Sequence, residues 1–252
     1  MAALERIVLW LLALVASIFG MTRIMTPKVE TGPVFQPAQE VETAPQYIGA
    51  LPEVVPGTEL RIQALVQYEG AYWEDGTGEY VSNVAALMIY NPSDTGISYG
   101  QVFLTLQGQE YAFEFTYLPA GGRLLVPEKH RLPYVRERVT HCRTGEMVFD
   151  NFGAEDKGFR LTPNGLSEIL LENTTQETMD QVTVLYKLYL AEQDVYLGGT
   201  TYEYIVENLA AGEIRETIPP KFVWGYSKVV DIQTENKGAS IHLRPCVLQN
   251  FG

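Results

Sequence analysis

The most reactive side chains of the sequence are two cysteines and the histidines beside them. Cys142 and Cys246 are the only cysteines; His141 adjoins the first, and His242 lies four positions before the second. Outside the cytoplasm such a pair often forms a disulfide. Closing so long a loop would stabilise the fold by about 4 kcal/mol in the chain-entropy model. We therefore name Cys142 and Cys246 as a possible disulfide, with two separate buried thiols as the alternative.

The same four side chains could serve two other chemistries. Two cysteines and two histidines are a zinc ligand set, but their spacing matches no zinc motif, and neighbours such as His141 and Cys142 point to opposite faces of a strand. A Cys–His nucleophile would need an acidic thiol and a third, orienting group, and the sequence indicates neither. We predict no metal site and no catalytic residue.

Two acidic clusters are the next candidates, at Glu74–Glu79 and at Asp150–Asp156. Calcium loops need oxygen ligands at regular offsets, and neither cluster has the EF-hand order. We interpret both as solvated turns. The sequence also has no GxSxG, P-loop or GxGxxG pattern, so we predict no cofactor and no enzyme activity.

Aromatic residues gather at two places, between positions 68 and 80 and between positions 222 and 226. Exposed aromatic clusters are typical of surfaces that contact proteins or glycans. Tyr72, Trp73 and Trp224 are therefore possible contact aromatics. Packing of the same rings in the core is the alternative.

The elements that position these residues begin with an apolar run. Ile7 to Met21 is interrupted only by Ser17 and Gly20. A helix of this length spans about 22 Å, which is short for a bilayer core of about 30 Å, although flanking residues can extend it. We predict a signal-anchor helix over residues 1–26. A cleaved signal peptide is the alternative.

The acidic net charge of the chain limits which partners it can bind. The net charge is −13, and because the first 28 residues carry +2, the rest of the chain carries −15. So acidic a body repels phosphate backbones, which argues against nucleic-acid binding. The few cations beside the apolar run leave its orientation open under the positive-inside rule. We place the body outside the cytoplasm because of its composition.

A proline-rich tether follows over residues 27–57, with prolines at 27, 33, 37, 45, 52 and 56. Proline removes a backbone donor, so the tether should be extended and semi-rigid. Beyond it, short runs rich in Val, Ile and Tyr alternate with turn residues every 8–12 positions. Gln107–Gln109 reads as a hairpin turn. The pattern predicts an all-β fold.

The β-rich part contains a weak internal repeat. Ala86–Asn91 is followed by two strands and Tyr117–Gly122, while Glu168–Asn173 is followed by two strands and Asn208–Glu213. We predict two β-sandwich domains, over residues 58–142 and 143–252.

The second of these regions carries a more specific motif. Tyr186-Lys187-Leu188-Tyr189 precedes a turn, a strand, and the corner Asn208–Glu213. This resembles the FxLYD-type domain, an immunoglobulin-like sandwich of bacterial envelope proteins, although Leu190 replaces the expected Asp. The resemblance implies a fold and a location and carries no catalytic residue. By strand alternation, Tyr186 and Leu188 should face one side of the strand and Lys187 and Tyr189 the other, so that one face can be buried while the other stays in water.

These features predict two tandem immunoglobulin-like sandwiches behind a transmembrane helix. The expected function is a non-enzymatic, single-pass envelope protein with an extracytoplasmic body. This body would act as a spacer and docking module for another envelope protein. An extracellular module that binds a ligand or glycan for adhesion is the alternative.

Overall fold

The computed structural model describes residues 51–153 and 157–235, and contacts group all of them into one compact unit. Every regular element in these ranges is a β-strand, which confirms the predicted all-β, sandwich-like fold. No helix in the described ranges is long and apolar enough to cross a membrane. The predicted anchor and most of the tether lie outside the described residues.

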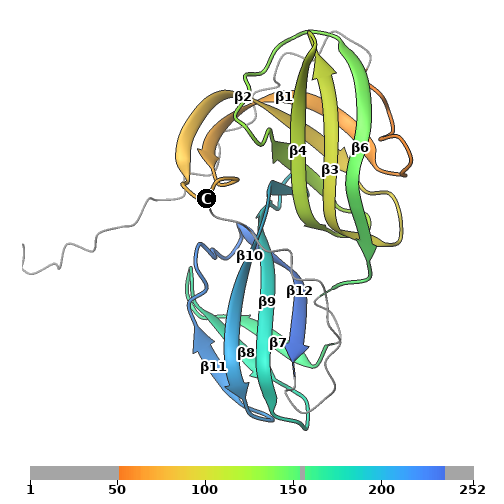
Figure 1. Cartoon of the computed structure of the whole chain (residues 1–252). Helices are drawn as coiled ribbons and strands as arrows, with labels where there is room; N and C mark the ends of the chain where they lie inside the picture. Colours follow the sequence, from red (N-terminus) through yellow and green to blue (C-terminus); the bar gives the residue numbers. More distant parts are fainter. Residues whose placement is uncertain (1–50, 154–156, 236–252) are drawn as a thin grey trace, which may run out of the picture. The chain divides into compact units, whose positions relative to one another are not determined.

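Twelve strands divide evenly between residues 51–150, the first half, and residues 157–235, the second half (Figure 1). The first half contains β1 (Arg61–Tyr72), β2 (Glu79–Tyr90), β3 (Gly96–Leu106), β4 (Gln109–Leu118), β5 (Arg123–Pro127) and β6 (Val139–Asp150). The second half contains β7 (Phe159–Pro163), β8 (Ile169–Asn173), β9 (Met179–Leu190), β10 (Val195–Leu209), β11 (Ile214–Thr217) and β12 (Ser227–Glu235).

Both halves arrange their six strands in the same way. In the first half, β1-β2-β5 lie side by side, and β4-β3-β6 form a separate sheet. In the second half, β7-β8-β11 form one sheet and β10-β9-β12 lie side by side. Each order takes the first, second and fifth strand together and the fourth, third and sixth together. The structure thus confirms the internal repeat that the sequence indicated.

The predicted hairpin between β3 and β4 is confirmed, and its turn explains its sequence. Leu106 pairs with Gln109, so only Gln107 and Gly108 connect the strands. Both have positive φ, 51° and 79°. A two-residue turn of this kind matches the twist of the flanking strands and favours glycine at the second position.

A buried asparagine forms the same corner in each half. Asn91 Nδ2 donates to Thr95 O and Pro119 O, at 2.9 and 3.2 Å. Its counterpart Asn173 donates to Glu177 O at 2.8 Å. It also donates to the carbonyls of residues 209 and 210, both at 3.1 Å. Each asparagine therefore connects the end of one strand to the segment that follows a distant strand. The sequence repeat thus corresponds to a repeated hydrogen-bonded corner.

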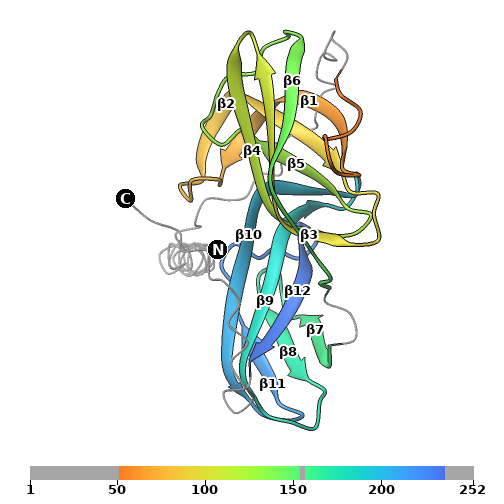
Figure 2. The same ribbon diagram turned by 45° about the vertical axis from the view of Figure 1, so that its right-hand side comes forward.

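The halves are joined through a shared sheet. β5 pairs in parallel with β10, Leu124 opposite Tyr196 and Leu125 opposite Leu197, so that one six-stranded sheet runs β1-β2-β5-β10-β9-β12. Figures 1 and 2 show the upper end of β10 beside the strands of the first half. We call residues 188–197, the turn and strand ends that reach this far, the β9–β10 arm.

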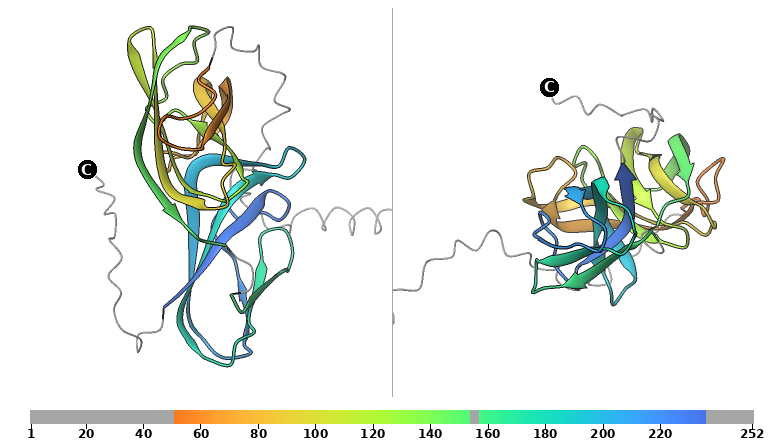
Figure 3. Two further views of the ribbon diagram at one scale, coloured as in Figure 1. Left: turned by 90° about the vertical axis from the view of Figure 1, so that its right-hand side faces the viewer. Right: turned by 90° about the horizontal axis from the view of Figure 1, so that it is seen from below.

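The cores of the halves are also connected. Leu185, Tyr196 and Val230, from the second half, belong to the larger apolar cluster, which otherwise consists of first-half residues. A smaller cluster around Tyr186 and Phe222 fills the second half. The outer face of the second-half sheet is thus covered by the first half over part of its area (Figure 3).

Two predicted boundaries look different in the structure. The boundary between residues 142 and 143 lies inside β6, which pairs with β3 along most of its length. The end of the predicted tether packs on the body, because Val55 is fully buried and its N–H donates to Leu60 O at 2.8 Å. A turn and an apolar contact therefore begin before the first long strand.

Candidate functional site

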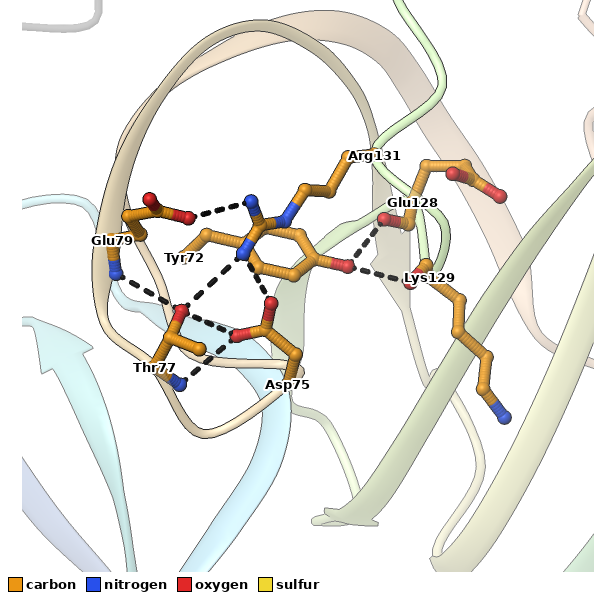
Figure 4. A network of polar contacts seen from close by, with 7 residues as sticks. All are labelled: Tyr72, Asp75, Thr77, Glu79, Glu128, Lys129 and Arg131. Carbon is orange, nitrogen blue, oxygen red and sulfur yellow. Dashed lines mark hydrogen bonds and ion pairs between the residues drawn. The ribbon is translucent and has the colours of Figure 1, made fainter. Parts of the chain in front are cut away.

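Tyr72, the first predicted contact aromatic, lies inside the molecule. It ends β1 and is fully buried, and its hydroxyl donates to the carbonyls of Glu128 and Lys129, both at 2.8 Å (Figure 4). Burial raises the pKa of Tyr72 far above its usual range. Tyr72 therefore offers no ring surface to a partner and holds the end of β1 to the chain beyond β5.

The turn after Tyr72 is fixed by Arg131, whose guanidinium lies 4.8 Å from the Tyr72 ring centroid. Arg131 forms ion pairs with Asp75 and with Glu79, the latter at 2.8 Å (Figure 4). Desolvation opposes ionisation of Asp75, but hydrogen bonds from Thr77 and Arg131 outweigh it and lower its pKa. These carboxylates are exposed, so their pairing contributes little stability and mainly sets the shape of the turn.

Trp73 is half-buried and contacts both halves. Gly78 lies close to its ring, since an added Cβ there would stand 2.0 Å from a ring carbon. The Lys221 ammonium lies over the ring, 3.8 Å from its centroid. Lys221 belongs to the second half and adopts a positive φ of 59°. This ring therefore serves as a contact between the halves.

Trp224 is half-buried at the edge of the second-half core. Its indole N–H donates to Glu168 O at 3.1 Å, and its ring meets the Phe222 ring edge-on, with centroids 5.3 Å apart. Trp224 and Trp73 contact different groups. The structure thus places the three predicted contact aromatics in separate packing roles rather than in one exposed patch.

A buried lysine that the sequence did not single out occupies the junction of the halves. Lys187 on β9 is fully buried. Its Nζ donates to Thr116 O on β4 at 3.0 Å, to Gly199 O at 2.8 Å and to Thr200 O at 3.0 Å. Strand alternation allowed one buried and one wet face, but Tyr186 and Lys187 are both fully buried, because β4 and the chain after the β9–β10 arm cover the Lys187 face of β9.

Glu74 completes this junction from the β1–β2 turn. Its carboxylate accepts from the Gly199 N–H at 2.9 Å and from the Thr200 hydroxyl at 3.2 Å. The interpretation of the acidic cluster as a solvated turn therefore fails at Glu74. Among the described residues no carboxylate forms a direct ion pair with Lys187. Glu74 is the charge that favours its ammonium form.

Burial perturbs both titrating groups of the junction. Desolvation lowers the pKa of Lys187 to about 7, against partial compensation by the Glu74 charge. Desolvation also raises the pKa of Glu74, opposed by the Gly199 hydrogen bond and by Lys187. A lysine with a low pKa can act as a nucleophile, but the amine of Lys187 is closed to solvent and surrounded by protein acceptors. The arrangement therefore fits a structural role, in which this junction holds the two halves together.

This junction predicts a pH dependence of stability. The unfolded chain holds the Lys187 proton up to about pH 10.5, whereas the folded chain releases it near pH 7. Since the unfolded state binds more protons in this window, the Lys187 contribution makes the free energy of unfolding rise with pH. We expect denaturant titrations from pH 7 to 9.5 to show this rise in the wild type and a flatter profile in Lys187→Met. Equal slopes would contradict it.

Gly199 is required by the close approach of β10 to β4. A Cβ at this position would lie 2.0 Å from Glu114 O, a main-chain atom that moves only with its strand. We expect Gly199→Ala to lower the free energy of unfolding by about 1–3 kcal/mol, the usual cost of overpacking. Gly153→Ala is the matched control, since a Cβ there has no neighbour within 4 Å. Denaturant unfolding of both variants measures the difference.

A second buried charge holds the connection between the halves. Asp231 on β12 is 2% exposed. It accepts from the Gly153 N–H at 3.1 Å, from Gln233 Nε2 at 3.0 Å, and forms an ion pair with Lys157. Gln233 also donates to the Tyr117 hydroxyl at 3.0 Å. Gly153 and Lys157 are thus both attached to the sheet of the second half.

The predicted cysteine and histidine set is only partly described. Cys142 is half-buried on β6 opposite Leu104, and burial raises the pKa of its thiol. Its neighbour His141 is exposed. Cys246 and His242 lie outside the described residues, so the disulfide stays a prediction. In the described ranges no three His, Cys, Asp or Glu side chains are placed to hold a metal ion.

Comparison with known proteins adds no relative to this picture. No family model, no characterised protein and no solved structure matches the chain. The resemblance to the FxLYD-type domain stays a prediction.

Proposed function

We propose that this chain is a non-enzymatic, membrane-tethered envelope protein whose body is a spacer and docking module for protein partners. The observation that carries the proposal is the burial of Lys187 between the halves. A buried, hydrogen-bonded cation specifies one arrangement of the groups around it. A body with such a joint presents its surfaces at fixed positions, as a docking module requires.

The proposed body consists of two immunoglobulin-like sandwiches, β1–β6 and β7–β12, with the boundary in residues 151–158 rather than between 142 and 143. The repeated strand order supports this division. The shared sheet and core hold the two sandwiches together, so we treat them as one rigid module. Large apolar contacts between domains suppress the relative motion that small polar contacts allow.

The location comes from the sequence. The apolar run from Ile7 to Met21 is the proposed anchor, the proline-rich stretch lifts the body from the bilayer, and the body lies outside the cytoplasm. A body with a charge of −15 avoids anionic lipid and nucleic acid. Its partner is therefore another envelope protein.

Cross-linking in intact source cells tests the proposal. The full chain and a variant lacking residues 57–252 are cross-linked, purified through a tag at the same end, and analysed by mass spectrometry. We expect a small, reproducible set of envelope proteins that only the full chain retains. Recovery of the same proteins with both chains would place binding outside the body and contradict the docking function.

A variant of the buried junction, expressed in the same cells, tests whether docking depends on the fixed arrangement of the two halves. Lys187→Ala disturbs the junction without changing the exposed surface, because the side chain is fully buried. If partners need both sandwiches at fixed positions, this variant should retain fewer of them at equal abundance in the membrane. Unchanged recovery would restrict docking to one sandwich.

A further inference from the structure

The repeat allows the second half to be compared with the first, position by position. The buried asparagines Asn91 and Asn173 align the strands that precede them. Tyr90 pairs with Arg123 on β5, and Glu172 pairs with Ile214 on β11. β11 is therefore the counterpart of β5, with Arg215 in the place of Leu124 and Glu216 in the place of Leu125.

These two strands have different surroundings. In the first half, Leu124 is fully buried in the larger apolar cluster and Leu125 is 6% exposed in a smaller one with Val195, and both residues pair with the β9–β10 arm. In the second half, β11 pairs only with β8 within the described ranges, and Ile214 on the same strand is 58% exposed. An edge strand of this kind can accept another strand.

Arg215 places a charged side chain on this edge strand and connects it to the opposite sheet. Its guanidinium donates to the main-chain carbonyls of Glu207 and Asn208 on β10, the latter at 3.0 Å. It is held by Glu213, whose Oε1 lies 2.9 Å from Arg215 Nε. One side chain of β11 thus occupies acceptors at the neighbouring edge of the opposite sheet.

The same main-chain position is occupied by a cation in the first half. Leu118 and Leu209 are equivalent, so Glu207 corresponds to Thr116. Thr116 O accepts from Lys187, which the second half supplies. Glu207 O accepts from Arg215, which belongs to its own half. A carbonyl that receives a lysine from the following sandwich in one case receives an internal arginine in the other.

We propose that Arg215, with Glu216, caps the second sandwich and prevents its β11 edge from accepting a further strand. Tandem repeats need such polar terminal units to stay soluble. Charged side chains on short edge strands are a common way to prevent edge-to-edge pairing. This inference rests on the proposed two-sandwich layout.

The test introduces into β11 the two leucines that β5 carries at the equivalent positions of the first half. Full-length wild type and the Arg215→Leu/Glu216→Leu variant are purified in the same detergent and compared by sedimentation velocity over a range of concentrations. We expect concentration-dependent self-association in the variant, through β11 edges of two copies, that the wild type lacks. Identical sedimentation of the two chains would overturn the inference.

Controls separate the edge from general stickiness and from misfolding. Glu172→Leu makes the same change as Glu216→Leu, but on the central strand β8, and should sediment as the wild type does. If circular dichroism shows that the double variant has lost its β-structure, the single variant Glu216→Leu replaces it in the sedimentation test, since the Glu216 side chain is exposed. Association no greater than in Glu172→Leu would then refute the cap. These results do not depend on partner capture in cells.

Discussion

Replacing Lys187 with alanine is expected to lower the free energy of unfolding by about 3–5 kcal/mol, the range seen when one partner of a buried polar or charged set is removed. The substitution removes the donor to Thr116 O, Gly199 O and Thr200 O. The hydroxyls of Thr201 and Thr116 still donate to the first two of these carbonyls. It also opens a cavity where the lysine stem was packed. Denaturant unfolding at pH 7 measures the change as a shift of the midpoint at constant slope.

Lys187→Met separates the two contributions. Methionine fills much of the same space and removes a desolvated charge, but it donates no hydrogen bond. We expect a loss of about 1–3 kcal/mol, smaller than for alanine, because the unpaired carbonyls remain and the cavity does not. A loss below about 1 kcal/mol in the alanine variant would mean that water or a shifted strand replaces the amine, and the joint would not depend on Lys187.

Asn173→Ala should produce the second large effect, a loss of about 2–4 kcal/mol. The side chain is fully buried and donates to the carbonyls of residues 177, 209 and 210, while its oxygen accepts from the Thr175 N–H at 3.0 Å. Alanine removes all of these hydrogen bonds, although the Thr175 hydroxyl and the Glu213 N–H still donate to the carbonyls of residues 177 and 210. Each group that loses its last partner where water cannot reach costs about 1–3 kcal/mol. Thermal and denaturant unfolding both report the loss.

Two further asparagine variants make this prediction specific. Asn91→Ala removes the equivalent corner of the first half and should also be clearly destabilising. Asn164→Ala removes an amide that contacts only the carboxylates of Glu168 and Glu216 and should change stability by about 0.5 kcal/mol or less. Equal, small effects in all three variants would contradict the role of the corners.

The sequence predicts the strands and the repeat because both follow from local signals. The sequence itself shows the regular spacing of turn residues and β-branched runs. It also shows that the segments ending in Asn91 and Asn173 are alike. The junction depends on contacts between distant positions, and Thr116 lies 71 residues from Lys187. Strand alternation placed Lys187 on the face opposite Tyr186, and it is the contact with β4 that buries this second face as well. A lysine within the apolar run Val184–Leu190 was the available signal.

The predicted contact aromatics illustrate the same limit. Tyr72 appears as one of several aromatic residues near a turn, while the carbonyl of Glu128, which accepts its hydroxyl, lies 56 residues away. Lys221 covers Trp73 from the other half of the chain. Composition predicted that rings would gather near these turns. Whether a ring is exposed depends on segments that only the folded chain brings together.

The insertion of the β9–β10 arm into the first half has a consequence for biosynthesis. The larger apolar cluster is complete only when Leu185, Tyr196 and Val230 are present. A chain emerging from the ribosome therefore cannot complete the core of its first half until nearly all of the second half has followed. During that interval the apolar edge at Leu124 and Leu125 is uncovered, and such surfaces bind chaperones or aggregate. Folding of the first half is thus expected to depend on the arrival of the second half, whichever compartment the chain folds in.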